Sequence, residues 1–276
     1  MMKPSRLFLI FLTLLAVSVA TAQGPNKFTK TDSFDFGAGG SISITGAPNG
    51  SIRVVGGPKA EVEIVAEVEV SGANGAELAK LAAATGFVET HDNIRATILT
   101  VGSHNKFGLK KLPKDFPKNL LTASYRVNYT ITVPAYIDLE IEAGRGDLSV
   151  IGVEGALHVN AIESRANVEI IGGNIAITIG IGSADISFGS KGIRARSVDV
   201  QVARGDVNVW FPANASANID ATVLRSGTIA NLTTDLKPRD RKIAFTDKSL
   251  AAKVGVGGPL LKFIVTEGTI TLNSKP

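Results

Sequence analysis

GRGDLSV, at residues 144–150, is the first of five related segments that decide the fold. The others are SRANVEI (164–170), GSADISF (182–188), ARGDVNV (203–209) and RSGTIAN (225–231). Aligned on Asp147, their corner residues are Asn167, Asp185, Asp206 and Thr228, at spacings of 20, 18, 21 and 22. A further segment with alternating apolar residues lies between each pair. Two strands and a Gly- or Asx-containing corner, repeated at a period near 20, predict a β-solenoid whose coils stack on one another.

Alternation within the repeats assigns the two faces of each strand. The residues expected to point inward are Leu148, Val150, Leu157, Val159, Val168, Ile170, Ile175, Ile177, Ile186, Phe188, Val198, Val200, Val207 and Val209. Those expected outside are Ser149, His158, Asn160, Glu169, Thr178, Ser187, Asp199, Gln201 and Asn208. An antiparallel sandwich would show the same alternation, but it would not need corners at one period. We therefore expect an all-β fold, a single-stranded β-solenoid with coils of about 20 residues.

The sequence before the repeats also predicts strands, together with one helix. AEVEIVAEVEV (60–70) and YRVNYTITV (125–133) place apolar residues on one face and polar residues on the other. GAELAKLAAATG, near residues 75–86, has alanine and leucine between two glycines, which is typical of a short helix.

The first 22 residues have the pattern of a secretory signal peptide. Lys3 and Arg6 flank the start, an apolar stretch covers 7–17, and Ala20-Thr21-Ala22 forms the cleavage signal. The stretch is shorter than the about 20 apolar residues of a bilayer span, so no transmembrane segment is expected after cleavage. The remaining single domain, 23–276, is expected to be exported to the periplasm, the outer surface or the extracellular space.

Charge and cysteine content narrow the functional classes. The chain has 29 basic and 25 acidic residues, so loss of Lys3 and Arg6 leaves a net charge of +2. A nearly neutral chain has no general attraction to nucleic acid or membrane. The sequence has no cysteine, so the hydrophobic core must hold an exported domain together without disulfide bonds.

Arg145-Gly146-Asp147 and Arg204-Gly205-Asp206 match the tripeptide of integrin ligands. Integrin ligands present it at the tip of a mobile loop, whereas here Leu148 and Val207 lead directly into predicted strands. Glycine permits a positive φ, and aspartate can bond to its own backbone, so a small residue followed by an Asx residue suits a corner, as in Ala166-Asn167 and Ala184-Asp185. The pattern favours a structural corner over cell binding, with the arginines incidental to it.

Several of these motifs resemble the bacterial putative-adhesin domain family, a group of exported β-solenoid proteins of unknown biochemical role. The matching residues are Val133-Pro134, Gly146-Asp147-Leu148, Gly205-Asp206-Val207, Phe211-Pro212 and Gly227-Thr228-Ile229. The resemblance covers most of residues 31–276. It implies a β-solenoid and a location in the cell envelope.

The sequence shows little that is typical of an enzyme. His91, His104 and His158 share no motif, and no nucleophile, phosphate-loop or metal-ligand pattern is present. Asp185, Asp199, Asp206 and Asp220 could in principle meet on one outer face, as acids do in glycan-cleaving solenoids, but corners account for two of them. We expect no catalytic residue, no cofactor and no metal.

One segment, SHNKFGLKKLPKDFPKN at 103–119, interrupts the pattern and predicts a lysine-rich loop insertion. It holds Lys106, Lys110, Lys111, Lys114 and Lys118, with Phe107 and Phe116 interleaved. A solvated insertion whose phenylalanines pack on the domain is one interpretation. The other is a ligand-binding segment for an anionic glycan or envelope polymer. Trp210, expected on the outer side of its strand, is a further candidate ligand-binding residue.

Three functional hypotheses follow. The first is a non-enzymatic, adhesin-like surface or envelope module that binds a glycan, an envelope polymer or a surface protein, or serves as a scaffold. The second is a structural protein that self-assembles without a specific ligand. The third is a glycan-active β-helix enzyme. The sequence does not determine the oligomeric state.

Overall fold

The computed structural model describes residues 27–71, 75–233, 236–240 and 244–274, so the expected signal peptide at 1–22 lies outside the described residues. The described chain is mostly β, with eighteen strands in one hydrogen-bonded sheet. The strands are β1 (Lys27–Asp35), β2 (Ser41–Thr45), β3 (Ile52–Gly57), β4 (Glu61–Val70), β5 (Gly86–His91), β6 (Arg95–Val101), β7 (Tyr125–Pro134), β8 (Asp138–Arg145), β9 (Leu148–Ile151), β10 (Leu157–Ile170), β11 (Gly173–Phe188), β12 (Ala195–Phe211), β13 (Ala217–Ser226), β14 (Ile229–Asn231), β15 (Lys237–Pro238), β16 (Ser249–Val254), β17 (Leu260–Glu267) and β18 (Ile270–Ser274).

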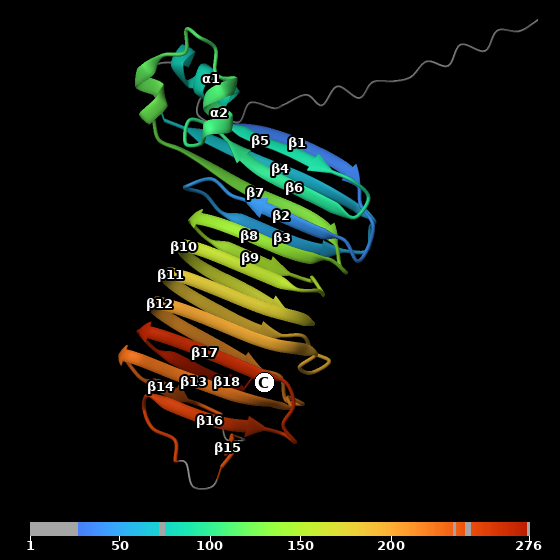
Figure 1. Cartoon of the computed structure of the whole chain (residues 1–276), viewed down its shortest axis with the longest axis vertical. Coiled ribbons are helices and arrows are strands. Elements are labelled where there is room, and N and C mark those ends of the chain that lie inside the picture. Colours follow the sequence, from blue (N-terminus) through green and yellow to red (C-terminus); the bar gives the residue numbers. More distant parts are fainter. Residues whose placement is uncertain (1–26, 72–74, 234–235, 241–243, 275–276) are drawn as a thin grey trace, which may run out of the picture.

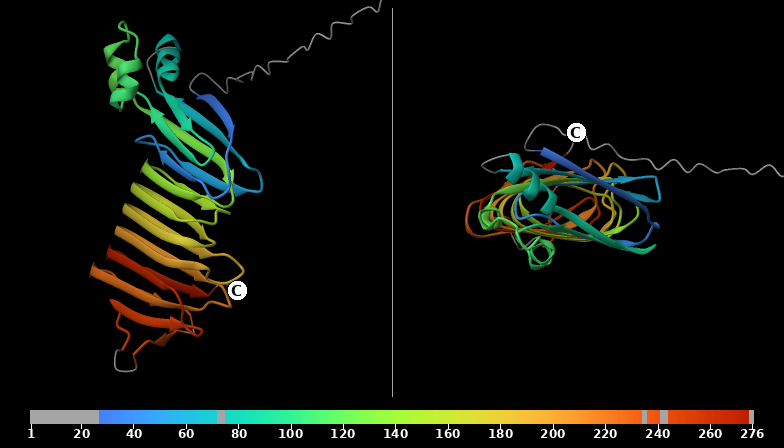
Figure 2. Two further views of the ribbon diagram at one scale, coloured as in Figure 1. Left: turned by 45° about the vertical axis from the view of Figure 1, so that its right-hand side comes forward. Right: turned by 90° about the horizontal axis from the view of Figure 1, so that it is seen from above.

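The strands form two parallel ladders that share their long members. One ladder runs β6–β2–β8–β10–β11–β12–β17–β13. The other runs β7–β3–β9–β10–β11–β12–β18–β14. Strands β10, β11 and β12 turn a corner midway and so contribute one half to each ladder. The result is an elongated stack (Figure 1) whose strands outline a flattened oval when seen from above (Figure 2).

Antiparallel strands lie at both ends of the stack. At the N-terminal end β4 pairs with β7 and β1, and β5 pairs with β6. At the other end β16 pairs with β13 and β15. Each ladder therefore changes from parallel to antiparallel pairing near an end, which limits the parallel stack to its middle part.

The core is a continuous aliphatic filling between the two ladders. All fourteen residues expected to point inward are buried, from Leu148 to Val209, and none is more than 6% exposed. The nine residues expected outside are half-buried or exposed. The alternation assigned the two faces of each repeat strand correctly because parallel pairing keeps side chains of one parity on one side of the sheet.

The expected alignment of the corner residues is wrong by two positions in two places, between the first and second segments and between the third and fourth. Asn167 pairs with Ser149 instead of lying level with Asp147, and Asp185 pairs with Asn208 instead of Asp206. The fifth segment is also displaced, because β18 lies between β12 and β14. The offsets between paired strands are therefore 18 from β8 to β10, 18 from β10 to β11 and 23 from β11 to β12.

At the corner of each stacked strand the residues that lie next to one another are glycines, with one exception, and are not the aspartates. The column consists of Gly50, Gly146, Ser164, Gly182, Gly205, Gly268 and Gly227. Its six glycines have φ between 122° and 143°. A Cβ on Gly205 would lie 1.7 Å from the carbonyl oxygen of Gly182, and one on Gly146 would lie 2.1 Å from that of Gly50. Neighbouring backbones approach too closely here for a side chain.

Helices cover the N-terminal end. The expected helix is confirmed as α1 (Gly75–Ala84), and it ends before Gly86 because β5 begins there. The lysine-rich segment is not a plain loop: it contains α2 (Lys106–Lys111) and a 3₁₀ turn, η1 (Lys118–Thr122). Asn105 caps α2, since its side-chain oxygen accepts a hydrogen bond from the Gly108 nitrogen at 2.7 Å. Within the described ranges, no helix is both long and apolar enough to cross a bilayer.

The glycine column yields a stability prediction. Gly146→Ala should lower the free energy of unfolding by about 1–3 kcal/mol from backbone strain alone, with the clash against Gly50 adding to this. Gly189→Ala is the control, because a Cβ there meets only Ile171 atoms at 3.9 Å or more, and it should cost less than about 0.5 kcal/mol. Urea denaturation measures both. Equal costs would show that the close backbone approach does not constrain the corner.

The assignment of faces yields a second prediction. Ile177→Asp should prevent folding, because a carboxylate buried in an aliphatic core finds no partner. Ser187→Asp, on an outer face, should leave the melting temperature within a few degrees of the wild-type value. Circular dichroism during heating distinguishes them. Similar melting temperatures for the two variants would contradict this placement of the core.

Candidate functional site

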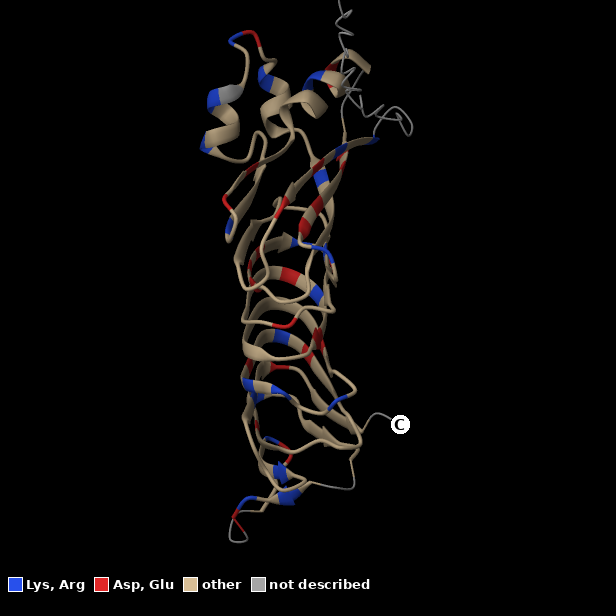
Figure 3. Cartoon of the chain, turned by 90° about the vertical axis from the view of Figure 1, so that its right-hand side faces the viewer, with Lys and Arg blue, Asp and Glu red and all other residues tan. Residues whose placement is uncertain are grey.

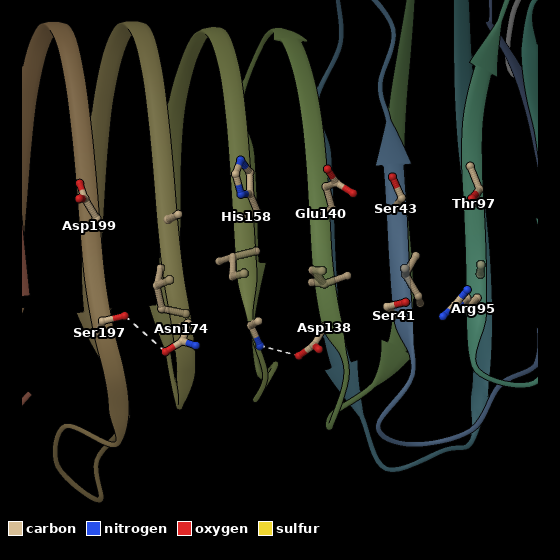
Figure 4. A pocket seen from close by; sticks show the side chains of 17 residues that line it. Ser41, Ser43, Arg95, Thr97, Asp138, Glu140, His158, Asn174, Ser197 and Asp199 are labelled. Atoms are coloured by element: carbon tan, nitrogen blue, oxygen red, sulfur yellow. Dashed lines mark hydrogen bonds between the residues drawn. The ribbon is translucent and has the colours of Figure 1, made fainter.

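A polar groove crosses the first halves of the ladder strands on one outer face. Strands β6, β2, β8, β10, β11 and β12 lie side by side here, and their outward side chains form two rows (Figure 4). One row contains Arg95, Ser41, Asp138, Ala156, Asn174 and Ser197. The other contains Thr97, Ser43, Glu140, His158, Ala176 and Asp199. The β11–β12 register shifts between Gly173 and Asn174, and from Asn174 onward the pairing is regular, which keeps each row straight.

Small residues create the hollow of the groove. Ala156 and Ala176 interrupt the rows beside the longer side chains of Glu140, His158 and Asp199, and the hollow has a volume of ≈ 610 Å³. A second hollow, of ≈ 480 Å³, lies further along the same strands at Thr45, Glu142, Asn160 and Thr178. The face is therefore grooved across the strands, and it is open along its length.

Hydrogen bonds between neighbouring strands fix several of the groove's polar groups. Asn160 donates to Glu142 Oε1 at 2.7 Å. Asp199 accepts from Gln201 at 2.9 Å and from Lys262 at 3.3 Å. The carboxylate of Glu140, by contrast, makes no hydrogen bond or ion pair with another residue in the described ranges. It is exposed to solvent next to His158, whose Nε2 lies 3.2 Å from the Asn160 amide nitrogen, so the carboxylate and the other imidazole nitrogen can bond to a ligand.

The charge of the groove determines which ligands fit it. Its lining includes three carboxylates, those of Asp138, Glu140 and Asp199, against the guanidinium of Arg95. Lys262 beside the lining pairs with Asp199, which leaves an excess of one negative charge. The groove is therefore acidic, and it disfavours polyanions. No group of His, Asp and Glu residues in the described part of the chain could hold a metal ion. The hydroxyl, carboxylate and imidazole groups that remain can exchange hydrogen bonds with a polyhydroxylated ligand.

The lysines that the sequence singled out lie together at the N-terminal end (Figure 3), and none of them lines the ≈ 610 Å³ hollow. Lys106 and Lys110 are on α2, Lys114 follows the helix, and Lys118 begins η1. These four residues are exposed and make no ion pair within the described ranges. The side chain of Lys111 lies outside the described residues.

The two phenylalanines of the lysine-rich segment have different environments. Phe107 is 44% exposed on α2, whereas Phe116 is half-buried and packs against the core. One therefore anchors the segment to the domain, as the first interpretation of the sequence proposed for both.

Trp210 lies elsewhere again. It points outward from β12 as expected, but it is half-buried between the positions of Ser187 and Asn273 on the opposite ladder. Strands β6 and β12 are five strand spacings apart, or about 24 Å. The structure therefore does not bring Trp210 and the lysines into one site.

The two Arg-Gly-Asp corners make ion pairs between neighbouring strands. Arg145 lies 3.4 Å from Glu163, and Arg165 bonds to both oxygens of Asp147 at 3.0 and 3.1 Å. The hydrogen bond that Arg165 donates to Asp147 raises the pKa of Arg165. At the second corner Arg204 lies 3.5 Å from Glu267. The arginines are thus part of the corner's surface, although they are incidental to the repeat.

Reasoning from the sequence did not identify the groove. Its signal is present in the outward residues Glu140, His158, Ala176 and Asp199, whose spacing follows the offsets of 18, 18 and 23. Alignment on the Asx corners gave intervals of 20, 18 and 21 instead. These outward positions therefore did not fall into one row.

Comparisons with known proteins give distant structural similarities only. No protein-family model and no curated protein matches the chain. A crystal structure of a putative cell adhesion protein from Clostridium sporogenes is similar at 11% identity and a TM-score of 0.47, covering 90% of this chain and 100% of that chain. A putative adhesin from Bacteroides fragilis gives 12% identity and 0.32, covering 91% and 99%. A putative lipid binding protein from Parabacteroides distasonis gives 10% and 0.23, covering 90% and 97%.

Proposed function

We propose that this chain is an exported, non-enzymatic protein of the cell envelope, adhesin-like in that it holds an extended glycan in the polar groove. The observation that carries the proposal is the ≈ 610 Å³ groove across the parallel strands, with Glu140, His158 and short hydroxyl side chains directed outward. The signal-peptide pattern at 1–22 supports export. The mature chain, 23–276, is one domain in this proposal.

The same proposal treats the parallel stack as a β-solenoid. Offsets of 18, 18 and 23 between paired strands support coils of about 20 residues. Two ladders that share β10, β11 and β12 are the two faces that such coils would present. A solenoid repeats the same outward positions on coil after coil, and it therefore suits a ligand that also repeats.

The spacing and chemistry of the groove favour a glycan over other extended ligands. Neighbouring strands place equivalent side chains about 4.8 Å apart, so hydrogen-bonding groups recur along the groove at short, even intervals. Ser41, Ser43 and Thr97 supply hydroxyls, and Glu140 supplies a free carboxylate. Because the lining is acidic, we propose a neutral or amino-bearing glycan for this face and not an anionic one.

Binding without catalysis is supported by how the acids are arranged. Asp199 is held by Gln201 and Lys262, and Glu142 by Asn160. The groove is open along its length, so water reaches its polar groups.

We predict that Glu140→Ala combined with His158→Ala weakens retention on immobilised neutral or amino glycans at least tenfold. The matched control is Glu169→Ala with Asn208→Ala, two outward residues of the opposite ladder, which should retain wild-type binding. A glycan array with the purified mature chain measures both. If the wild-type protein binds no glycan, or if both double variants bind as it does, the groove is not a glycan site and a self-assembling structural role is favoured.

The lysine-rich segment supports a second candidate function, attraction of polyanions. Lys106, Lys110, Lys114 and Lys118 are exposed and unpaired within the described ranges, on a protein whose expected mature charge is only +2. A local positive field of this kind attracts anionic envelope polymers, and salt weakens it over a Debye length of about 8 Å at physiological ionic strength. This field and the acidic groove are separate, so the two functions can coexist.

Changing Lys106, Lys110 and Lys114 together to Ser should abolish salt-sensitive retention on a cation-exchange or acidic-glycan matrix without lowering the melting temperature. The control changes Lys59, Lys191 and Lys248 to Ser, which removes the same charge elsewhere. Retention equal to that of the control would assign the attraction to overall charge. A large fall in melting temperature would instead make the segment structural.

A further inference from the structure

A separate, largely apolar pocket lies under the helices at the N-terminal end. It has a volume of ≈ 460 Å³, within the range of small-molecule sites. The end of α1, the start of β5, the end of β6 and the segment from α2 to Phe116 enclose it. Its apolar walls include Phe87, Val88, Val101, Leu112, Pro113 and Phe116. None of these residues belongs to the polar groove.

One wall of the pocket carries a lysine without an acidic partner. Lys30 of β1 is half-buried, and its ammonium donates to the carbonyl oxygen of Thr85. Within the described ranges Lys30 makes no ion pair, and burial lowers its pKa. Lys80 of α1 also lines the pocket, as does one carboxylate, that of Asp115. The described lining is therefore cationic overall.

Two further features concern the residues that surround the Lys30 side chain. A Cβ on Gly86 would lie 2.8 Å from both Cδ and Nζ of Lys30, so the glycine leaves room for the lysine stem. Thr85, whose carbonyl oxygen accepts from the ammonium, is itself fully buried, so the end of the lysine is fixed in the pocket wall. An anionic group beside Lys30 would supply the missing counter-charge.

We propose that this pocket binds an amphiphile with one alkyl chain and an anionic head group. The chain would lie against Phe87, Val88 and Phe116, and the head group would meet Lys30. The lysines of α2, the helix whose Gly108 lines the pocket, add a positive field that attracts the anionic end. The apolar walls are the reason to propose an alkyl chain. The ammonium of Lys30, which has no acidic partner among the described residues, is the reason to propose an anionic head group.

Isothermal titration of the purified mature chain with dodecanoate tests the proposal, with dodecanol as the uncharged comparison. Lys30→Met keeps the stem and removes the charge, so it should weaken dodecanoate at least tenfold and leave dodecanol unchanged. Ala83→Trp, at the exposed edge of the pocket, should block both ligands. Ala79→Trp, also exposed on α1 but outside the pocket lining, is its matched control and should bind like the wild type.

Proton uptake gives a second readout that a purely structural lysine would not produce. A bound carboxylate raises the pKa of Lys30, so at alkaline pH, where free Lys30 is partly deprotonated, dodecanoate binding should take up protons from the buffer. Repeating the titration in buffers of different ionisation enthalpy measures this uptake, and Lys30→Met should abolish it.

The possible outcomes distinguish a lipid from a free fatty acid as the ligand, and they include results that would overturn the proposal. Displacement of dodecanoate by lysophosphatidylglycerol, which also has one chain, would identify a single-chain phospholipid as the source, whereas binding without displacement would identify a free fatty acid. Absence of dodecanoate binding, or binding unaffected by both Lys30→Met and Ala83→Trp, would overturn the proposal. Neither result bears on the glycan groove, whose residues are unchanged in these variants.

Discussion

Close contact between backbones at one corner is the constraint on which this structure depends. From Gly50 to Gly227, six glycines with positive φ stack so that the position of a Cβ is taken by the carbonyl oxygen of the neighbouring strand. Only glycine tolerates both the φ and the contact. The corner therefore fixes which residues of successive strands lie level, and the parallel register of both ladders follows from it. In β10 the equivalent corner residue is Ser164, which does not have a positive φ. The stack of glycines therefore has one exception.

The site follows from that register. Because the strands are locked level, outward residues of one parity form straight rows, and the short side chains of Ala156 and Ala176 fall beside the long ones of Glu140 and His158. A shift of one strand by a single residue would exchange the inner and outer faces. The groove and the aliphatic core therefore both depend on the glycine corner. Its side chains, by contrast, contribute little to the core and are free to be selected for binding.

The alternation of apolar and polar residues predicted which face of each repeat strand is buried, because successive side chains of a strand point to opposite sides of the sheet. The stacking order was not predictable in the same way. Asp147 and Asn167 share corner chemistry, but turn residues tolerate a shift of two positions that the glycine column does not. The insertion of β17 and β18 beside β12 joins segments about 60 positions apart, which no local period records. The lysine segment was recognised, yet the Asn105 cap that makes part of it helical was overlooked.

The molecule divides its surface chemistry by position along the stack. The face of the middle strands is acidic and lined by hydroxyls, whereas the N-terminal end carries the unpaired lysines and an apolar pocket. The exposed ion pairs at the Arg-Gly-Asp corners, such as Arg145 with Glu163, are of the type that adds little to stability. Backbone contacts hold those corners, so the arginines do not have to be retained for folding. A protein held together in this way can change its outer rows and its end cap independently, and one scaffold can then serve two ligands of opposite polarity.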